Sequence, residues 1–362
     1  MSEDLNFVLK ARREKLAQLE ALGVQPFAYG FDATHDTVTA LRALPAGAEE
    51  GPRVSVAGRL VAWRPHGKTI FGHVADSHSR LQVYFRRDEL GDAVFAQLAL
   101  FDIGDIVGVE GTLFRTRTGE TTVKVERATL LAKSLRPLPY GKDEIVDGTV
   151  VRHSGFADPE MRYRQRYADL AVNADVRRRF VARSRMTTEI RRALDALGYL
   201  EVETPVLQPL YGGAAARPFV THHNALDMTL YLRIADELYL KRLVVGGLDR
   251  VYEIGHDFRN EGIDRTHNPE FTMLEFYEAY ADYETMMDTV EQLICTVVTE
   301  TFGGPVFTYL GNEIDVTPPW PRKSLRDAIR EGSGMDYLDY PDAGSLLAAA
   351  RQAGADIETG TV

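Results

Sequence analysis

Residues 250–283 read RVYEIGHDFRNEGIDRTHNPEFTMLEFYEAYADY and contain two strand-like runs, 250–259 and 269–280. Side chains along a strand alternate between its two faces, so positions two apart share a face. One face of the second run is apolar and is expected to pack on a core, whereas the other combines an aromatic ring, a carboxylate and a phenol. The apolar face carries Thr272, Leu274 and Phe276, and the mixed face carries Phe271, Met273, Glu275 and Tyr277.

The first run ends near Arg259 and Glu261, which share a face by the same spacing. If the two runs pair antiparallel, these side chains meet Phe271, Glu275 and Tyr277 on one concave surface. A guanidinium there can hold a phosphate, an aromatic ring can stack on a base, and a cationic amine fits between carboxylate and phenol. A solvent-facing sheet with a mixed polar surface explains the same pattern, so the residues alone leave the choice open.

Helical and strand-like segments lie on the N-terminal side of this stretch. Residues 175–197 have helical spacing, residues 199–204 predict a strand, and a glycine-bearing loop follows at 211–213. A helix is expected around 237–245. At the start of the chain, residues 7–22 predict an amphipathic helix.

Residues 53–135 show a different pattern, with about five short strands separated by turn signals and no long helix. The alternating apolar positions include Val54, Val56, Leu81, Val83, Phe85, Val123 and Val125. This pattern favours a small closed barrel of the oligonucleotide-binding type. Another small β module remains open on pattern alone.

The composition is that of a globular chain with about two domains, since 44% of its 362 residues are hydrophobic and 26% are charged. No export signal is visible, and no apolar run approaches the ~20 residues of a membrane span. The single cysteine, Cys295, excludes an intrachain disulfide. A cytosolic location is therefore expected. The net charge of −11 argues against nucleic acid, but basic stretches such as 177–179 leave that partner open.

The segments FRNEGI and THNPEFTMLEFYEAYADY closely resemble motif 2 of the lysine-specific class II aminoacyl-tRNA synthetases. The likeness continues through RYRQRYADL, EVETPVLQPLYGG and LYLRIADELYLKRLVVGG, and into the barrel at GKTIFGHVAD, LQVYF and TGE. It covers essentially the whole chain with long, specific motifs. The related aspartate and asparagine enzymes share the architecture but carry a different motif 2.

The resemblance implies an α+β fold, with an oligonucleotide-binding barrel followed by the class II antiparallel sheet flanked by helices. The implied domains are an N-terminal helix and lead-in over 1–52, an anticodon-binding barrel over 53–135, a linker over 136–150, and a partial catalytic domain with motifs 1 and 2 over 151–362. It also implies a ligase that uses ATP to activate L-lysine and load it onto tRNA-Lys.

For ATP, the resemblance gives Arg259 the catalytic role of holding the α-phosphate together with the lysine carboxylate, which fits donors aimed at an oxyanion. It places Glu261 and Asn268 on the adenine side, Phe271 against the base and His267 at the distal phosphates. The alternative for His267 is a loop histidine with a backbone partner.

For lysine, the resemblance gives Glu237 and the Gly213 carbonyl to the α-ammonium, and Glu275 with Tyr277 to the ε-ammonium. Arg259 takes the carboxylate. Burying an ammonium is costly unless a carboxylate meets it, and an uncharged side chain would leave Glu275 buried and unpaired. Glu237 can also be read as a first-turn glutamate at the positive end of a helix dipole.

In the barrel, Arg64, Phe71 and Gln82 match positions that read a uridine-rich anticodon, with Phe71 stacking on a base. The alternative for Phe71 is a core phenylalanine after a turn. The EVETPVL segment resembles motif 1, which forms the dimer interface in this class, so a homodimer is expected.

Motif 3, the carboxylates that bind Mg²⁺ and further lysine-pocket residues have no counterpart before the final IETGTV. The chain is therefore expected to be truncated, to lack metal ligands of its own and to be inactive or weakly active. A non-catalytic tRNA- or protein-binding module derived from a synthetase is the main alternative. The paralogue that modifies an elongation factor is disfavoured, because it lacks the barrel.

Overall fold

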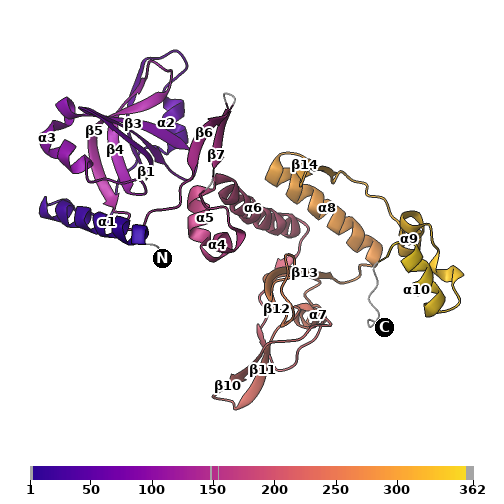
Figure 1. Cartoon of the computed structure of the whole chain (residues 1–362). Helices are drawn as coiled ribbons and strands as arrows, with labels where there is room; N and C mark the ends of the chain where they lie inside the picture. The colour runs from indigo at the N-terminus through magenta and orange to yellow at the C-terminus, as the bar shows by residue number, and fades with distance from the viewer. Residues whose placement is uncertain (1–2, 147–148, 154, 356–362) are drawn as a thin grey trace. The chain divides into compact units, whose positions relative to one another are not determined.

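The computed structural model describes residues 3–146, 149–153 and 155–355 (Figure 1). The final IETGTV segment and part of the expected linker at 136–150 lie outside these described residues. The chain forms two compact units, Met1–Arg178 and Arg179–Val362. The expected domain boundaries remain predictions, and each unit is described by itself below.

The first unit contains a closed five-stranded barrel in the order β1-β2-β3-β5-β4. Its strands are β1 (Glu50–His66), β2 (Thr69–Ala75), β3 (Arg80–Arg86), β4 (Ile106–Arg115) and β5 (Thr121–Ala132). β3 and β5 are parallel, and the other pairs are antiparallel. The structure thus confirms the small closed barrel expected from the sequence.

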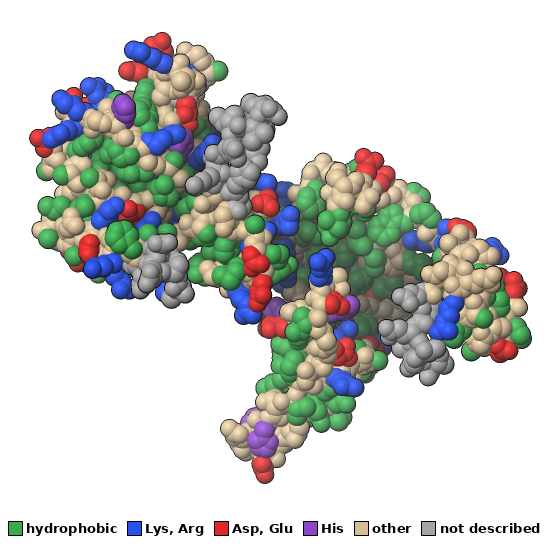
Figure 2. Space-filling view, in the orientation of Figure 1, with side chains coloured by type: hydrophobic (Ala, Val, Ile, Leu, Met, Phe, Trp, Pro, Cys, Tyr) green, Lys and Arg blue, Asp and Glu red, His purple; other side chains and the backbone are tan. Residues whose placement is uncertain are grey.

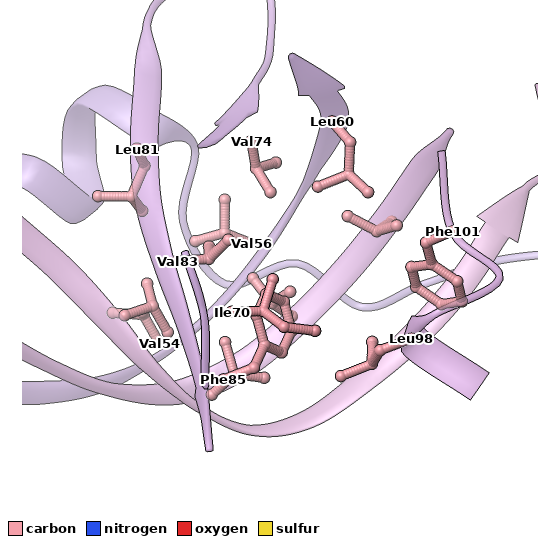
Figure 3. Packing of buried hydrophobic residues seen from close by; sticks show 14 of the residues in the cluster. Val54, Val56, Leu60, Ile70, Val74, Leu81, Val83, Phe85, Leu98 and Phe101 are labelled. Atoms are coloured by element: carbon pink, nitrogen blue, oxygen red, sulfur yellow. The ribbon is translucent and has the colours of Figure 1, made fainter. Parts of the chain in front are cut away.

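The barrel interior is filled by one face of each strand, as the alternating pattern predicts. All seven apolar positions singled out from the sequence are buried in one cluster, and several of them point toward one another in Figure 3. A β-bulge lies between Glu110 and Gly111, where the backbone of β4 comes very close to that of its neighbour β5. A Cβ at Gly111 would lie 1.9 Å from the Lys124 carbonyl oxygen, so this close approach requires glycine.

Helices and a hairpin complete the first unit. Leu19 of α1 and Ala40 of α2 are fully buried in the barrel cluster, as the amphipathic N-terminal pattern predicts for α1. The remaining elements are α1 (Glu3–Ala21), α2 (Thr37–Ala43), α3 (Arg87–Leu98), β6 (Lys142–Val146), β7 (Thr149–His153), α4 (Pro159–Arg164) and α5 (Arg166–Val172).

The second unit is built around the long helix α6 (Ala174–Ala196) and a sheet in the order β13-β12-β8. The two strand-like runs of the sequence become β12 (Arg250–Phe258) and β13 (Glu270–Glu278), which pair antiparallel. β8 is only Leu200–Glu201, shorter than the strand expected over 199–204. The ladder ends early because the Thr204 N–H donates to the Glu253 carboxylate rather than to a backbone carbonyl.

The apolar face of β13 packs as predicted. Leu274 and Phe276 lie against a buried cluster whose members come from α6, β12 and α8 (Tyr283–Phe302). The buried members of that cluster are Leu194, Tyr199, Tyr252, Leu293 and Val297. The mixed face of β13 is therefore turned away from this core.

The other elements of the second unit flank this sheet. α7 (Glu237–Val245) coincides with the expected helix, and a second sheet has the order β10-β11-β9. Its strands are β9 (Leu207–Gln208), β10 (Val220–His223) and β11 (Met228–Leu232). Beyond α8 follow β14 (Val306–Tyr309), β15 (Asn312–Asp315), α9 (Leu325–Ser333), η1 (Tyr337–Asp339) and α10 (Ala343–Gln352). Among the described residues, no helix combines the length and the apolar character needed to cross a membrane.

Candidate functional site

The pairing of β12 with β13 places charged side chains from both strands on one face. Glu253 lies opposite Glu275, and Asp257 lies opposite Phe271. Directly opposed residues of an antiparallel pair point to the same side of the sheet. The face that the sequence marks as unusual is therefore more acidic than the second run alone indicates.

Arg259 and Phe271 meet at one end of this face. The guanidinium carbon of Arg259 lies 5.2 Å from the centroid of the Phe271 ring, within the range of a cation–π contact. The Arg259 Nε donates to the carbonyl of Ile234 at 3.3 Å, and its backbone N–H donates to Pro269. The structure thus brings together the arginine and the aromatic ring as the sequence predicts.

Glu275 and Tyr277 form the acidic part of the site. The Tyr277 hydroxyl donates to Glu275 Oε2 at 3.0 Å, and the Asp236 N–H donates to Glu275 Oε1 at 3.4 Å. Burial, followed by the negative charge of Glu275, raises the pKa of Tyr277 above its usual range. Tyr277 therefore remains a protonated donor at neutral pH, and the Glu275 carboxylate remains available to a cation.

Glu237 and Gly213 lie side by side, as their shared predicted role requires. Gly213 has φ = 89°, and a Cβ there would lie 3.0 Å from the Glu237 Cβ and 3.6 Å from its Oε2. Glu237 is the first residue of α7 and pairs with Lys241 one turn later at 2.6 Å. The Lys241 ammonium also lies 5.7 Å from the centroid of the Tyr277 ring. One lysine thus already contacts two of the predicted lysine-binding residues.

The remaining predicted ATP residues lie in the exposed loop between β12 and β13. Glu261 accepts a hydrogen bond from the Arg217 N–H at 3.2 Å, His267 bonds Asp264 at 2.7 Å, and the Asn268 side chain donates to the Glu270 carbonyl. These hydrogen bonds thus join the three residues to the loop, to the first residue of β13 or to Arg217. The structure does not join them to the Glu275–Tyr277 pair.

A buried arginine that the sequence analysis did not single out lies behind the site. Arg233 is only 2% exposed and forms ion pairs with Asp236 at 2.9 Å, Glu253 at 2.5 Å and Asp257 at 3.2 Å. Its Nε also donates to the His256 carbonyl at 3.0 Å. We call Arg233 and its three carboxylate partners the Arg233 cluster. It ties the start of α7 to β12.

Room for the guanidinium depends on Gly255, which lies between Glu253 and Asp257 along β12. A Cβ at Gly255 would lie 1.8 Å from the Arg233 Nη2 atom. Because Arg233 is buried and held by its partners, it has little freedom to move aside. Glycine is therefore needed at position 255 to let the Arg233 guanidinium lie against the backbone of β12, and not to form a turn.

The Arg233 cluster contains more negative than positive charge. Glu253 is well satisfied, since it also accepts from the N–H and hydroxyl of Thr204. Asp236 and Asp257 are fully buried, and no oxygen of either side chain has a hydrogen-bond partner. Burial, together with the charge of Asp257, raises the pKa of Asp236 to about 8, and burial also raises the pKa of Asp257. Asp236 is therefore largely protonated at neutral pH.

Part of the Arg233 cluster could have been predicted from the spacing of residues in the sequence. Glu253, Asp257 and Arg259 are four and two residues apart in the first run and so share a strand face, an arrangement unusual for a purely structural strand. Arg233 gave no such signal, because its partners Glu253 and Asp257 lie far away in the sequence. Only the tertiary fold identifies it.

In the barrel, the three predicted anticodon residues lie on β1, β2 and β3. Phe71 follows the core residue Ile70 but is itself outside the core, with its ring centroid 4.5 Å from that of Tyr84. The Tyr84 ring lies 5.9 Å from that of Phe114, so three rings form a row on the outer face. The alternative of a core phenylalanine is therefore not supported. Arg64 lies opposite Phe71 on β1.

Gln82 is hydrogen-bonded to Glu120, a residue that was not among the predicted site residues. Its amide donates to Glu120 Oε2 at 2.7 Å, while His73 Nε2 contacts Glu120 Oε1 at 2.9 Å. Gln82 also accepts a hydrogen bond from the Thr122 hydroxyl at 2.8 Å. Glu120 belongs to the TGE segment, so its position in that motif was the available signal.

A magnesium ion, which the resemblance implies, lacks a candidate ligand set in the part of the chain that the structure describes. No group of three or more histidine, cysteine, aspartate or glutamate side chains is arranged there to hold a metal. Arg233 also occupies the space among the most clustered carboxylates. The described residues therefore do not fit this cofactor.

The chain is similar to known proteins over nearly its whole length. Residues 158–347 match the family described as tRNA synthetases class II (D, K and N), and residues 54–131 match the OB-fold nucleic acid binding domain. A lysine–tRNA ligase of Moorella thermoacetica is 50% identical over 355 residues, which are 98% of this chain and 70% of the relative. Lysine–tRNA ligases of Carboxydothermus hydrogenoformans and Pelotomaculum thermopropionicum are 47% and 48% identical. They match 99% and 98% of this chain, and 71% and 68% of their own lengths.

Replacing Arg233 should destabilise the second unit strongly. In Arg233→Met, the buried carboxylates lose their counter-ion, and we expect a loss of about 3–5 kcal/mol in the free energy of unfolding. Urea denaturation at pH 7 measures this loss. Arg242→Met, at an exposed arginine of α7, is the matched control and should stay within about 0.5 kcal/mol of the parent chain. Equal stabilities for the two variants would contradict the central role of Arg233.

Proposed function

This chain belongs to the class II aminoacyl-tRNA synthetases and, within them, to the lysine–tRNA ligase family, and we propose from this premise that it activates L-lysine with ATP for transfer to tRNA-Lys. One observation carries the proposal: the acidic Glu275–Tyr277 pair shares a sheet face with the Arg259–Phe271 pair. A single small molecule with a cationic side chain and a carboxylate can engage both ends of such a face.

In the proposed first step, an oxygen of the lysine carboxylate attacks the α-phosphorus of ATP. The bond to the bridging oxygen breaks, pyrophosphate leaves and lysyl-adenylate forms. Arg259 would orient the two anionic reactants, because its planar guanidinium offers several fixed donors. Its contact with the Ile234 carbonyl and its proximity to the Phe271 ring limit its motion, and restricted donors stabilise developing charge more effectively.

In the proposed second step, a terminal ribose hydroxyl of tRNA attacks the carbonyl carbon of the adenylate and AMP leaves. Phe271 would hold the adenine ring during both steps by stacking. Glu261, His267 and Asn268 remain proposed nucleotide contacts, supported by their place in the loop next to Arg259. No step is assigned to Mg²⁺, because the described residues provide no ligand set for it.

Lysine selection would rest on charge. Glu275 would meet the ε-ammonium together with the Tyr277 hydroxyl, and Glu237 would meet the α-ammonium next to Gly213. A neutral side chain in the pocket would leave the Glu275 carboxylate desolvated without a partner, which is strongly unfavourable. The half-buried position of Glu275 supports this role.

We also propose a homodimer. Exposed apolar side chains lie at the end of the EVETPVL segment and on the β10-β11-β9 sheet and its loops, a part of the molecule where Figure 2 shows apolar surface. They are Val206, Leu207, Leu210, Val220 and Leu226. Exposed apolar patches of this kind mark protein interfaces. Sedimentation velocity at micromolar concentration should therefore give twice the monomer mass, and a monomer at all concentrations would contradict the proposal.

Glu275→Gln tests the lysine site. The change keeps the shape of the side chain but removes its charge, so we expect lysine affinity to fall by about 2–4 kcal/mol while ATP affinity changes little. Isothermal titration with each ligand measures both affinities. Glu270→Gln, at an exposed glutamate of the same strand, is the matched control. A parent chain that binds tRNA but neither lysine nor ATP would favour the non-catalytic module instead.

Phe71→Ala tests the barrel. Loss of a stacking ring should weaken tRNA-Lys binding by roughly 1–3 kcal/mol, while lysine binding without tRNA stays unchanged. Fluorescence anisotropy with labelled tRNA measures the first quantity. Tyr29→Ala removes a fully exposed ring outside the Phe71–Tyr84–Phe114 row and should bind tRNA like the parent. Normal tRNA binding by a folded Phe71→Ala variant would remove Phe71 from the proposed RNA contact.

A further inference from the structure

Behind the Glu275–Tyr277 pair lies a pair of aspartates that the proposed chemistry does not use. Asp236 immediately precedes α7, Asp257 lies on β12, and both side chains are fully buried. None of their four oxygens makes a hydrogen bond, and their contacts with Arg233, at 2.9 and 3.2 Å, are ion pairs only. Buried carboxylates without hydrogen bonds are disfavoured, so the ionisation state of the pair requires an explanation.

Arg233 does not supply enough positive charge for both aspartates. Its guanidinium is shared by three carboxylates, and its shortest ion pair, at 2.5 Å, is with Glu253. The other charged or titratable groups around the pair add mainly negative charge. They are Glu237 and Lys241 of α7, Glu253 and His256 of β12, Arg259 after β12, and Glu275 and Tyr277 of β13.

One proton shared by the two aspartates would account for both their missing hydrogen-bond partners and the excess of negative charge around them. A protonated Asp236 donates to Asp257, which gives each carboxyl group a hydrogen-bond partner and removes one negative charge from the cluster. The two carboxyl groups are neighbours, because both pair with the same guanidinium, Asp236 with Nη1 of Arg233 at 2.9 Å and Asp257 with its Nε at 3.2 Å. Each also affects the pKa of the other.

We propose that Asp236 and Asp257 share one proton in the free protein and release it when the ammonium group of lysine binds at Glu275. The two aspartates then act as positioning residues for lysine recognition, because their ionisation supplies negative charge behind Glu275 only when a cation is present. This inference rests on the proposed function, which places the ε-ammonium at Glu275.

The direction of the proton movement follows from the neighbours. The Glu275 carboxylate raises the pKa of both Asp236 and Asp257, so neutralising it with an ammonium lowers both. The lysine carboxylate acts in the opposite sense by neutralising Arg259, but Arg259 lowers the pKa of Asp257 alone, and there its influence is weaker than that of Glu275. The ammonium effect therefore prevails. An acid with a pKa of about 8 is still mostly protonated at pH 7.5, so a proton is available for release.

Calorimetry with lysine tests the proposal without relying on catalysis. Lysine is titrated into the full chain at pH 7.5 in phosphate, HEPES and Tris, whose ionisation enthalpies differ. We expect the binding heat to depend on the buffer, corresponding to release of roughly half a proton per lysine. Asp236→Asn and Asp257→Asn should each abolish this dependence, because an amide next to a carboxylate keeps a hydrogen bond but has no proton to release. Asp288→Asn, at an exposed aspartate of α8, is the matched control and should retain it.

The wild-type chain provides a second measurement in case either variant unfolds. If a proton is released, lysine affinity must increase with pH, by about fivefold between pH 6.5 and pH 8.0. Lysine binding whose heat is independent of buffer and whose affinity is independent of pH would overturn the shared proton but leave the proposed function intact. Absence of lysine binding in all buffers would instead refute the proposed function, and this inference with it.

Discussion

The second unit depends on one buried guanidinium. Arg233 joins Thr204 after β8, the strand β12 and the start of α7, segments that otherwise lie far apart in the chain. A buried arginine is tolerable only when carboxylates and carbonyls surround it. The arrangement that satisfies Arg233 also fixes Glu237 at the first turn of α7 and Asp236 against Glu275. The structural core of the unit thus positions residues of the proposed lysine site.

The same cluster combines structural ion pairs with carboxyl groups in an environment typical of binding sites. Two of the three carboxylates around Arg233 have no hydrogen-bond partner, and the pKa of each is raised. Perturbed acids of this kind concentrate at functional sites because binding a cation requires negative charge in a partly dry environment. Burying these acids costs free energy. Apolar packing on the opposite face of the same sheet, against the cluster that Leu274 and Phe276 contact, offsets this cost.

In the barrel, strand alternation places the core residues on the inner face and the rings proposed to bind RNA on the outer face. Inward-facing residues such as Val54 and Val83 form the core, while Phe71, Tyr84 and Phe114 form an outer row of rings. The barrel also contains a fully buried ion pair, between Lys133 and Asp105 at 2.9 Å, but none of the three rings belongs to it. An aromatic surface needs only a rigid platform to stack on bases.

The sequence by itself determined the five-stranded barrel, helix α7 and the β12–β13 pair, because strand and helix periods are local properties of the chain. It also determined that Phe271, Glu275 and Tyr277 share a face. It overestimated β8, and it did not identify Arg233, Asp236 or Glu120. The tertiary structure alone decided these, because their partners are distant in the sequence: Arg233 reaches Glu253 across 20 residues and Thr204 across 29. Burial and charge pairing become defined only when such distant segments meet.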